Sequence, residues 1–422
     1  MTSEIKQRIE RIRRGEVPER YVKTALGLAP ANWKRYTFGD IYTERKEPGD
    51  ENLPLLMVSI HSGVSDGEVD AAELPKQVKR IEDKSQYKKA VSGDLVFNMM
   101  RAWQGAIGTV RTTGMVSPAY IVAEPNGKAY PLFMDYYSRT PQMINQIDRQ
   151  SYGVTDFRKR LYWDSFAPIS CTLPPIEEQQ KIAAILTTQD RVIELKEKRL
   201  AEKQRQKKYL MQQLLTGKKR LPGFSGEWKN IKLCEVLSER KEKNVEQNLR
   251  ICSVAVQKGV IDQIEHLGRS YAASDTSNYS VAHYGDIIYT KSPTGDFLYG
   301  IVKQNLLQET VAVSPLYGVF TPMTFGLGYF LHTYFQSAIC AQNYLLPIVQ
   351  KGAKNTINIT NDTFISSKLY LPLDVEEQKA IADTFIAADR EIELLRQDIR
   401  QEKQKKKALM QLLLTGIVRA KT

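Results

Sequence analysis

The 422-residue sequence has few of the residues that build metal and redox sites. It contains four cysteines and four histidines, and neither set shows the CxxC or HxxxH spacing of a zinc site. Each cysteine stands alone in an apolar or strand-like stretch, so we expect buried, reduced thiols without disulfides or bound metal. The cysteines are Cys171, Cys234, Cys252 and Cys340, and the histidines are His61, His266, His283 and His332.

Long apolar runs are also missing. No stretch of 18 apolar residues is present, and the opening stretch MTSEIKQRIERIRRGE has no apolar segment as long as that of a signal peptide. With 42% apolar and 26% charged residues, the composition is that of a soluble globular protein, and the length predicts roughly two to four domains. We therefore expect a cytoplasmic protein that does not contact a membrane.

Catalytic signatures are absent as well. The sequence has no GxxxxGK[ST] phosphate loop and no HExxH motif, and FGLGYF lacks the third glycine of a dinucleotide fingerprint. The stretches SPAY and SPLY resemble the four-residue motif of amino-methyltransferases, but each lacks its second proline, so a turn at a strand end is the preferred interpretation. These absences predict a chain without an active site.

Positive charge, in contrast, is in excess. The formal net charge is +12 at pH 7, which permits a polyanionic partner. The excess lies in residues 1–30 (+3), 177–220 (+6) and 376–422 (+2), whereas residues 31–176 (+1) and 221–375 (0) are nearly neutral. Two interpretations of the basic segments stand: they contact DNA phosphates, or they face acidic surfaces of partner proteins.

A long block of sequence occurs twice. Residues 177–217 and 376–416 align without a gap, and 19 of the 41 positions are identical. Apolar residues recur every seven positions in both blocks, which predicts two long helices with one buried seam each. Glutamates follow a proline at the start of each block, where they complement the helix dipole, and Thr-Gly closes each block. The seam positions are Leu186, Ile193, Leu200, Lys207 and Leu214 in the first block, and Phe385, Ile392, Ile399, Lys406 and Leu413 in the second.

The seam lysines Lys207 and Lys406 stand where the seven-residue spacing predicts apolar residues. Two interpretations of them remain open. Polar residues at seam positions fix the register of paired helices, or they mark a place where the helices diverge.

Shorter echoes flank the two blocks in the same order. Trp33-Lys34 recurs as Trp228-Lys229, and Glu44-Arg45-Lys46 recurs as Glu239-Arg240-Lys241. SGDLVFN recurs as YGDIIYT, each a predicted strand after a Gly-Asp turn, and VSPAY recurs as VSPLY. The predicted segments are an N-terminal helical arm with an extended linker (1–30), a first variable domain (31–172), a first long helix (173–220), a second variable domain (221–370) and a second long helix (371–422).

Polar, glycine-rich loops follow strands at equivalent places in the two variable domains. Arginine can bind guanine, Gln and Asn can bind adenine, and lysines contact phosphates. A solvated loop side chain is the simpler interpretation of any one residue, and the occurrence of such loops in both copies is what favours a DNA surface. The candidate DNA-binding residues are Arg101, Trp103, Gln104, Tyr152, Thr155, Arg158, Lys159 and Arg160 in the first domain, and Lys291, Thr294, Lys351, Lys354 and Asn355 in the second.

The repeated segments resemble the specificity subunits of Type I restriction-modification systems. The resemblance lies in LPPIEEQQKIA and LPLDVEEQKAIA, in LMQQLLTG and LMQLLLTG, in LPGFSGEWK, and in the two starts from Trp-Lys to Glu-Arg-Lys-Glu, and it covers essentially the whole chain. It implies an α+β fold with two pseudo-repeated target recognition domains, strand-rich with a few helices, separated by two long antiparallel coiled-coil helices. Each domain would read one half of a bipartite, asymmetric DNA target, and the helices would set the spacer between the halves.

The resemblance also implies partners and cofactors. The partners would be double-stranded DNA, two methyltransferase (modification) subunits and up to two restriction subunits that translocate along DNA and cleave it. Those subunits would bind S-adenosylmethionine, ATP and Mg, and this chain would bind no cofactor and catalyse no reaction. Two rival functions are a stand-alone or fused DNA adenine methyltransferase, which the missing motifs oppose, and a helical scaffold that does not bind DNA.

Overall fold

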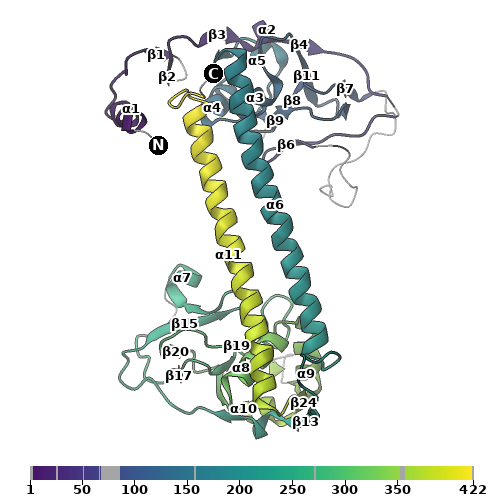
Figure 1. Ribbon diagram of the computed structural model, residues 1–422, viewed down its shortest axis with the longest axis vertical. Coiled ribbons are helices and arrows are strands. Elements are labelled where there is room, and N and C mark those ends of the chain that lie inside the picture. The colour runs from purple at the N-terminus through teal and green to yellow at the C-terminus, as the bar shows by residue number, and fades with distance from the viewer. Residues whose placement is uncertain are drawn as a thin grey trace. The chain divides into compact units, whose positions relative to one another are not determined.

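A computed structural model describes residues 3–24, 27–50, 52–65, 67, 86–155, 158–269, 272–351 and 357–420 of the chain. The chain forms two compact units. Unit 1 consists of Met1–Lys196 and Asp398–Thr422, and unit 2 consists of Glu197–Gln397. Each unit contains one variable domain together with half of each long helix (Figure 1).

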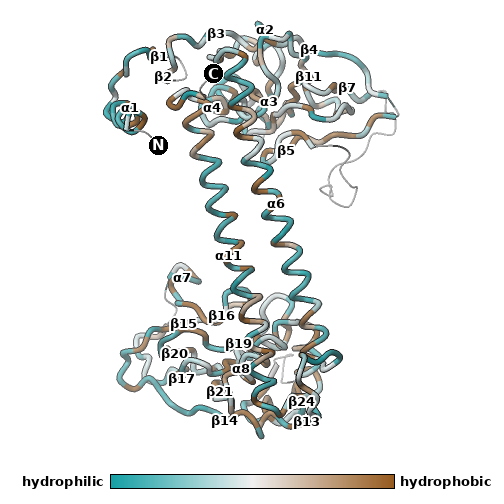
Figure 2. Tube along the Cα trace, in the orientation of Figure 1, coloured by the Kyte–Doolittle hydropathy of each residue, from teal (hydrophilic) through white to brown (hydrophobic). Residues whose placement is uncertain are grey.

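The two repeated blocks are the long helices α6 (Ile176–Leu214) and α11 (Val375–Leu413). Each ends three residues before the predicted glycine, and both glycines, Gly217 and Gly416, adopt the left-handed backbone conformation that follows a helix end (φ 67° and 70°). Figure 2 shows long hydrophilic stretches along both helices, interrupted by single hydrophobic turns. Every apolar seam residue is buried except Leu200, which is half-buried.

Within each unit the two helix halves run antiparallel. In unit 1 Lys196 of α6 contacts Asp398 of α11, and further back along α6 Gln189 contacts Glu402 of α11. In unit 2 Lys203 of α6 contacts Glu391 of α11. Ion pairs thus flank a seam that alternates apolar and charged layers, as in a coiled coil.

Buried acids tie each helix start to a neighbouring segment. Glu178 and Glu377, in the first turns, are each only 1% exposed. Arg419 donates to both carboxylate oxygens of Glu178 at 2.6 Å, and Arg220 holds Glu377, which also accepts from Trp228 Nε1 at 3.0 Å. The glutamates that were predicted to complement the helix dipole are therefore also members of buried ion pairs. A buried carboxylate requires such a partner, because it has lost its contact with water.

The variable domain of unit 1 contains a four-stranded antiparallel sheet in the order β4-β11-β8-β9. Its strands are β4 (Tyr42–Arg45), β11 (Tyr120–Pro125), β8 (Leu95–Asn98) and β9 (Ile107–Thr109). The helices are α2 (Phe38–Ile41), α3 (Pro131–Tyr137), α4 (Pro141–Gln150) and α5 (Trp163–Phe166). Short strand pairs add β5 (Val58–Ser59) with β6 (Gly63–Val64), and β7 (Lys88–Ala90) with β10 (Gly114–Val116).

The variable domain of unit 2 repeats this sheet in the order β14-β21-β18-β19. These strands are β14 (Leu237–Glu239), β21 (Gly318–Pro322), β18 (Ile287–Tyr289) and β19 (Val302–Gln304). A second sheet has the order β16 (Gly259–Asp262), β15 (Arg250–Ala255), β20 (Val311–Val313) and β17 (Ser280–Ala282). The helices are α7 (Gln263–Leu267), α8 (Phe325–Tyr334), α9 (Ala338–Leu345) and α10 (Asn361–Ser366).

The first and last strands of each variable domain pair with each other. In unit 1 β3 (Lys34–Thr37) pairs antiparallel with β12 (Ser170–Leu173), directly before α6. In unit 2 β13 (Lys229–Lys232) pairs with β24 (Lys368–Leu371), directly before α11. Each domain is therefore closed by a two-stranded ribbon at the start of a long helix.

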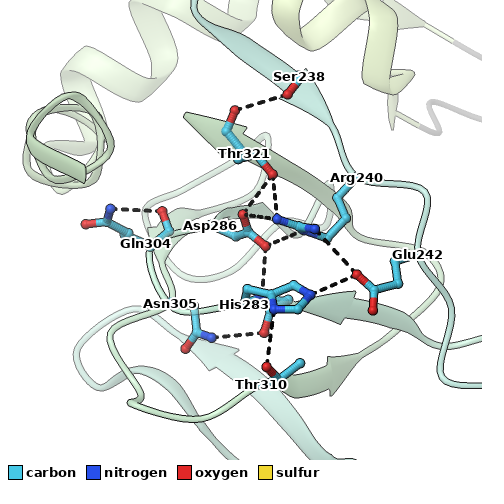
Figure 3. A network of polar contacts seen from close by, with 11 residues as sticks. Ser238, Arg240, Glu242, His283, Asp286, Gln304, Asn305, Thr310 and Thr321 are labelled. Atoms are coloured by element: carbon cyan, nitrogen blue, oxygen red, sulfur yellow. Dashed lines mark hydrogen bonds and ion pairs between the residues drawn. The ribbon is translucent and has the colours of Figure 1, made fainter. Parts of the chain in front are cut away.

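Two repeated motifs that are distant in sequence meet as a buried ion pair. In unit 2 Arg240 Nε lies 2.6 Å from Asp286 Oδ2, and the Thr321 hydroxyl donates to Asp286 Oδ1 over 3.0 Å (Figure 3). In unit 1 Arg45 Nε lies 2.8 Å from Asp94 Oδ2. Both aspartates are at most 2% exposed, so the arginine compensates the loss of carboxylate hydration and joins the first sheet strand to the turn before the third.

The Figure 3 network continues to the surface through His283. Its backbone N–H donates to Asp286 Oδ2 over 2.8 Å, and its Nε2 lies 2.8 Å from Glu242 Oε2. Glu242 thereby has a lowered pKa, chiefly through the hydrogen bond with His283. Unit 1 has Val91 at the place of His283, and there Lys89 contacts the corresponding Glu47 at 3.0 Å.

Most local predictions are confirmed, and two are wrong. Residues 3–14 form the predicted helix as α1 (Ser3–Arg13), and both VSP segments are turns at strand ends. The expected extended linker Tyr21–Pro30 is instead a hairpin of β1 (Tyr21–Thr24) and β2 (Gly27–Pro30), because the chain turns back at Gly27 (φ 110°). Cys171 and Cys252 are buried, but Cys234 is exposed and Cys340 is half-buried, because Cys234 lies in a short 3-10 turn and not in a strand.

None of the helices formed by the described residues combines the length and apolar character that crossing a bilayer requires. Within the same residues, no group of three or more His, Cys, Asp or Glu side chains is placed to hold a metal ion.

Candidate nucleic-acid interface

In unit 1 the first candidate loop connects β8 to β9. It contains one turn of 3-10 helix, Ala102–Gln104, and Gly105 closes the turn with a φ of 104°. Trp103 Nε1 donates to the Met100 carbonyl at 3.0 Å, which fixes the indole against its own loop. Arg101 and Gln104 are exposed on either side of this half-buried indole. The loop therefore presents a cation and an amide from a rigid turn.

The second candidate loop of unit 1 lies beside the first. Tyr152 and Arg160 form a backbone bridge with hydrogen bonds of 3.1 and 2.9 Å, and the next residue, Leu161, donates its N–H to the Met99 carbonyl at 2.9 Å. Lys159 Nζ lies over the Trp103 ring at 5.1 Å from its centroid. The structure therefore brings both predicted loops of the first domain together on one surface.

The candidate residues of this surface differ in what they can offer a ligand. Tyr152 is 58% exposed, and Thr155 and Arg158 are also exposed. Lys159 is half-buried and bonded to Asp148 Oδ1 at 2.8 Å, and Arg160 donates to a loop carbonyl. The exposed residues suit direct contacts with a ligand, whereas Lys159 and Arg160 hold the loop in shape.

Sequence reasoning missed three exposed side chains with apolar surface in or beside these loops, and one of them, Val154, is 91% exposed. Tyr162 is 42% exposed and packs on Tyr152 with ring centroids 5.8 Å apart, and Met100 is 39% exposed. Exposed aromatic rings beside cations are the usual stacking platform for nucleobases. The signal in the sequence was the Tyr-x9-Tyr spacing across the loop, which only the backbone bridge makes meaningful.

In unit 2 the corresponding loop connects β18 to β19. Lys291 adopts a left-handed backbone conformation (φ 58°), and burial lowers the pKa of its ammonium group. Thr294 is exposed in a turn closed by backbone hydrogen bonds with Phe297 at 3.0 Å. The loop thus occupies the predicted equivalent position, with Thr294 facing solvent and Lys291 partly withdrawn.

The second loop of unit 2 is only partly described. Lys351 lies in β22 (Gln350–Lys351), which pairs with β23 (Ile357–Asn358), and this hairpin follows α9 as the Tyr152–Arg160 bridge follows α4. The predicted residues Lys354 and Asn355 lie outside the described residues. The two hairpins occupy equivalent places in the two domains, which supports the prediction that the loop after Lys351 corresponds to the loop after Tyr152.

The seam lysines are paired across the helices. Lys207 of α6 contacts Asp389 of α11 in unit 2, and Lys406 of α11 contacts Asp190 of α6 in unit 1, with N–O distances of 2.5 Å in both. A charged side chain in a seam is tolerated when the facing helix supplies its counter-ion. This pairing supports the interpretation that the lysines fix register.

With the geometry described, comparison with known proteins identifies the family. The family model for the "Type I restriction modification DNA specificity domain" matches residues 76–204 and 226–403, which together make up most of the chain and include parts of both units. The chain belongs to this family.

Similar proteins agree with this assignment. The chain is 23% identical over 372 residues to the MjaVIII specificity subunit of Methanocaldococcus jannaschii, covering 80% of this chain and 83% of that protein. It is 22% identical to the putative MjaX specificity subunit of the same organism, covering 96% and 98%. Its fold is similar to the crystal structure of a Type I restriction-modification S subunit from M. genitalium (TM-score 0.56, 10% identity, covering 90% and 96%).

Family membership confirms the predicted class of function. The chain is a DNA specificity subunit of the Type I restriction-modification kind, and it recognises DNA sequence within a complex whose catalytic activities reside in other subunits. DNA and the modification and restriction subunits are the classes of partner that this membership implies. The alternative of a stand-alone or fused methyltransferase finds no support among the relatives.

Proposed function

We propose that each variable domain reads one half of a bipartite, asymmetric DNA target, and that α6 and α11 set the spacer between the halves. The observation that carries this proposal is the repetition of one sheet order and one pair of loop positions in the two units, with unrelated residues in the loops. Equal scaffolds with different reading residues suit two different half-sites. The proposed recognition domains are residues 31–172 and 221–370.

In this proposal the exposed loop residues supply the contacts with DNA. Arg101, Gln104 and Arg158 would read base edges or phosphates in the first half-site, and Tyr152 would stack or contact the sugar-phosphate backbone. Lys291 and Thr294, with residues 351–355, would serve the second half-site. Binding of both halves would be favoured only when the two half-sites have the separation that the chain imposes.

The remaining parts of the complex would supply the chemistry. Two modification subunits would dock on the repeated segments 173–220 and 371–422. They would transfer a methyl group from S-adenosylmethionine to adenine N6, after the adenine has left the base stack. Up to two restriction subunits would use ATP and Mg. The chain itself would contribute recognition and spacing, in a cytoplasmic complex.

Domain exchange tests the division of labour. The chain would be co-expressed with its modification subunits, and N6-methyladenine would be mapped across the genome. We expect one bipartite motif for the natural chain. Replacing residues 31–172 by the equivalent domain of a relative should change one half of the motif and leave the other half and the spacer intact. A change in both halves would refute the modular reading of DNA.

A helix insertion tests whether α6 and α11 set the spacer between the half-sites. Four extra residues after Leu200 would lengthen α6 by about 6 Å, roughly one turn. Together with the matching insertion after Leu395, which faces it in the antiparallel helix pair, this should change the spacer of the methylated motif or abolish methylation. Retention of the natural spacer by an active, folded variant would show that the helices do not set it.

A further inference from the structure

Each half of the helix pair meets its recognition domain at a cluster of one lysine, one aspartate and one tyrosine. In unit 1 Lys406 Nζ lies 2.5 Å from Asp190 Oδ1, and the Tyr136 hydroxyl donates to Asp190 Oδ2 over 2.7 Å. The lysine belongs to α11, the aspartate to α6 and the tyrosine to α3 of the recognition domain. Three elements that are separate in the chain therefore meet on one carboxylate.

Unit 2 repeats the cluster with the roles of the two helices exchanged. Lys207 of α6 pairs with Asp389 of α11, and the Tyr329 hydroxyl of α8 donates to Asp389 Oδ2 over 3.0 Å. Lys207 Nζ also donates to Gln336 Oε1, between α8 and α9, at 2.8 Å. The recognition domain thus contributes a direct hydrogen bond to the helix pair in each unit.

The two lysine–aspartate pairs belong to one antiparallel register, because the residue numbers of the partners add to the same value in both pairs. A slip by one heptad in one direction would set Lys207 against Ala382, and Lys406 against Ala183, both of which are buried. A slip in the other direction would set Lys207 against Arg396. Either slip leaves a seam cation without a proper counter-ion, which opposes it.

Burial makes the tyrosine links specific. Tyr136 is 1% exposed and Tyr329 is 4% exposed. Burial raises the pKa of both phenols, so both hydroxyls stay protonated at neutral pH and donate to the carboxylates. In unit 1 Lys406 also lies over the Tyr136 ring, 5.4 Å from its centroid. A tilt of the domain on the helices would break a charge-assisted hydrogen bond that no water can replace without opening the contact.

We propose that the two Lys–Asp–Tyr clusters are positioning sites that fix the orientation of each recognition domain on the helix pair and thereby restrict the target to a single spacer length. This inference rests on the proposed function above. An aspartate that accepts from a lysine of the other helix and from a tyrosine of the domain opposes helix sliding and domain tilting at one point. Because both units contain such a cluster, both recognition domains are held in a fixed orientation, and the spacer depends on the two clusters together.

The test measures spacer discrimination in the assembled complex. The full chain, co-purified with its modification subunits, would methylate duplexes that carry the natural half-sites at the natural spacer or at one base pair more or fewer. The variant joins Tyr136→Phe with Tyr329→Phe, which removes only the two hydroxyls. One lost charge-assisted hydrogen bond corresponds to a change of about tenfold, and the variant removes two, so we expect discrimination against the wrong spacers to fall by at least about tenfold. The rate at the natural spacer should stay within about threefold.

Matched variants separate positioning from other roles. Tyr284→Phe, an exposed tyrosine of the second recognition domain outside the candidate loops, should leave discrimination unchanged. Lys207→Met with Lys406→Met, which keeps the seam filled, should relax discrimination as the Phe pair does. Unchanged discrimination in a folded Phe pair would overturn the inference, and so would an equal loss of rate at every spacer. If the natural chain methylated duplexes with all spacers equally, the proposed function would be refuted, and this inference with it. That result is seen in the natural chain, whereas the two results that overturn only this inference are seen in the Phe variant.

Discussion

Replacing Lys303 by methionine should stabilise unit 2. Lys303 stands in the middle of β19 and is only 4% exposed. Burial lowers the pKa of its ammonium group, the positive charge of Lys207 adds to this lowering and Asp389 partly offsets it, so that the pKa is about 8. Lys303 faces Ile288 of β18, and in unit 1 the equivalent residue of β8, Val96, faces Gly108 of β9. The same sheet therefore forms in unit 1 without a lysine at this position.

The expected gain in stability follows from the lowered pKa of Lys303. A lysine with a pKa of 10.5 when unfolded and about 8 when folded binds fewer protons in the folded state between these values, so stability rises with pH across that window. Below about pH 8 the folded state carries the full penalty, about 3 kcal/mol at 1.36 kcal/mol per pKa unit. Methionine keeps the apolar stem and removes the charge, so Lys303→Met should gain about 2–3 kcal/mol at pH 7 and much less near pH 10.5.

Amide hydrogen exchange measures this locally. The opening free energy of β18 and β19 would be compared between the natural chain and Lys303→Met at several pH values. Lys368→Met, an exposed lysine of β24 in the same unit, is the control and should lie within about 0.5 kcal/mol of the natural chain. A Lys303→Met variant that is destabilised, or whose advantage does not shrink as pH rises, would refute the assignment of a poorly compensated buried cation.

Three further predictions concern the ion pairs and the loops. Arg240→Met leaves Asp286 buried without its cation and should destabilise unit 2 by about 3–5 kcal/mol in denaturant unfolding. Arg45→Met should destabilise unit 1 by a similar amount, because it leaves Asp94 buried without its cation. A loss of stability below about 1 kcal/mol would contradict the buried pairing. The Lys196 hydrogen bond, with that of Gln189, holds the pKa of Glu402 at about 2, below its ordinary 4.5, so this carboxylate stabilises the fold above pH 4.5 and the stabilisation is lost as pH falls towards 2. The melting difference between the natural chain and Glu402→Gln should therefore shrink below about pH 4.5, and a difference that grows in acid would contradict the sign. Arg101→Ala or Arg158→Ala should weaken DNA binding and reduce the slope of log K against log salt by about 1 if the side chain contacts a phosphate, whereas Arg191→Ala, paired with Glu194 on α6, should leave the slope unchanged.

The sequence was most informative where it repeats. The seven-residue spacing of Leu186, Ile193 and their partners predicted two long helices, because a buried stripe on a helix imposes that period. The repeated blocks 177–217 and 376–416 match the bounds of α6 and α11 to within three residues. The repeated Gly-Asp motif predicted a turn before a strand, and the repeated Glu-Arg-Lys-Glu motif predicted no element of structure. Their meeting as the Arg45–Asp94 and Arg240–Asp286 pairs depends on strand order, which short-range patterns do not encode.

The candidate site was predictable only in part. Loop positions followed from strands and glycines, and in unit 1 both loops do meet through Lys159 and Trp103. Which loop residues are free for a ligand did not follow, because Lys159 is held by Asp148, a residue on a helix earlier in the chain. Tyr162 was overlooked for the same reason: its exposure depends on a backbone bridge between residues eight apart.

The two-stranded ribbons that close each recognition domain have an evolutionary consequence. Because β3 pairs with β12, and β13 with β24, the chain enters and leaves each domain at adjacent strands. Gene recombination with crossovers inside the repeated helix-coding blocks would therefore deliver a whole domain with both ends already in place. New target sequences can arise by such shuffling in one step, while point mutation would have to alter each loop separately and keep every buried ion pair intact.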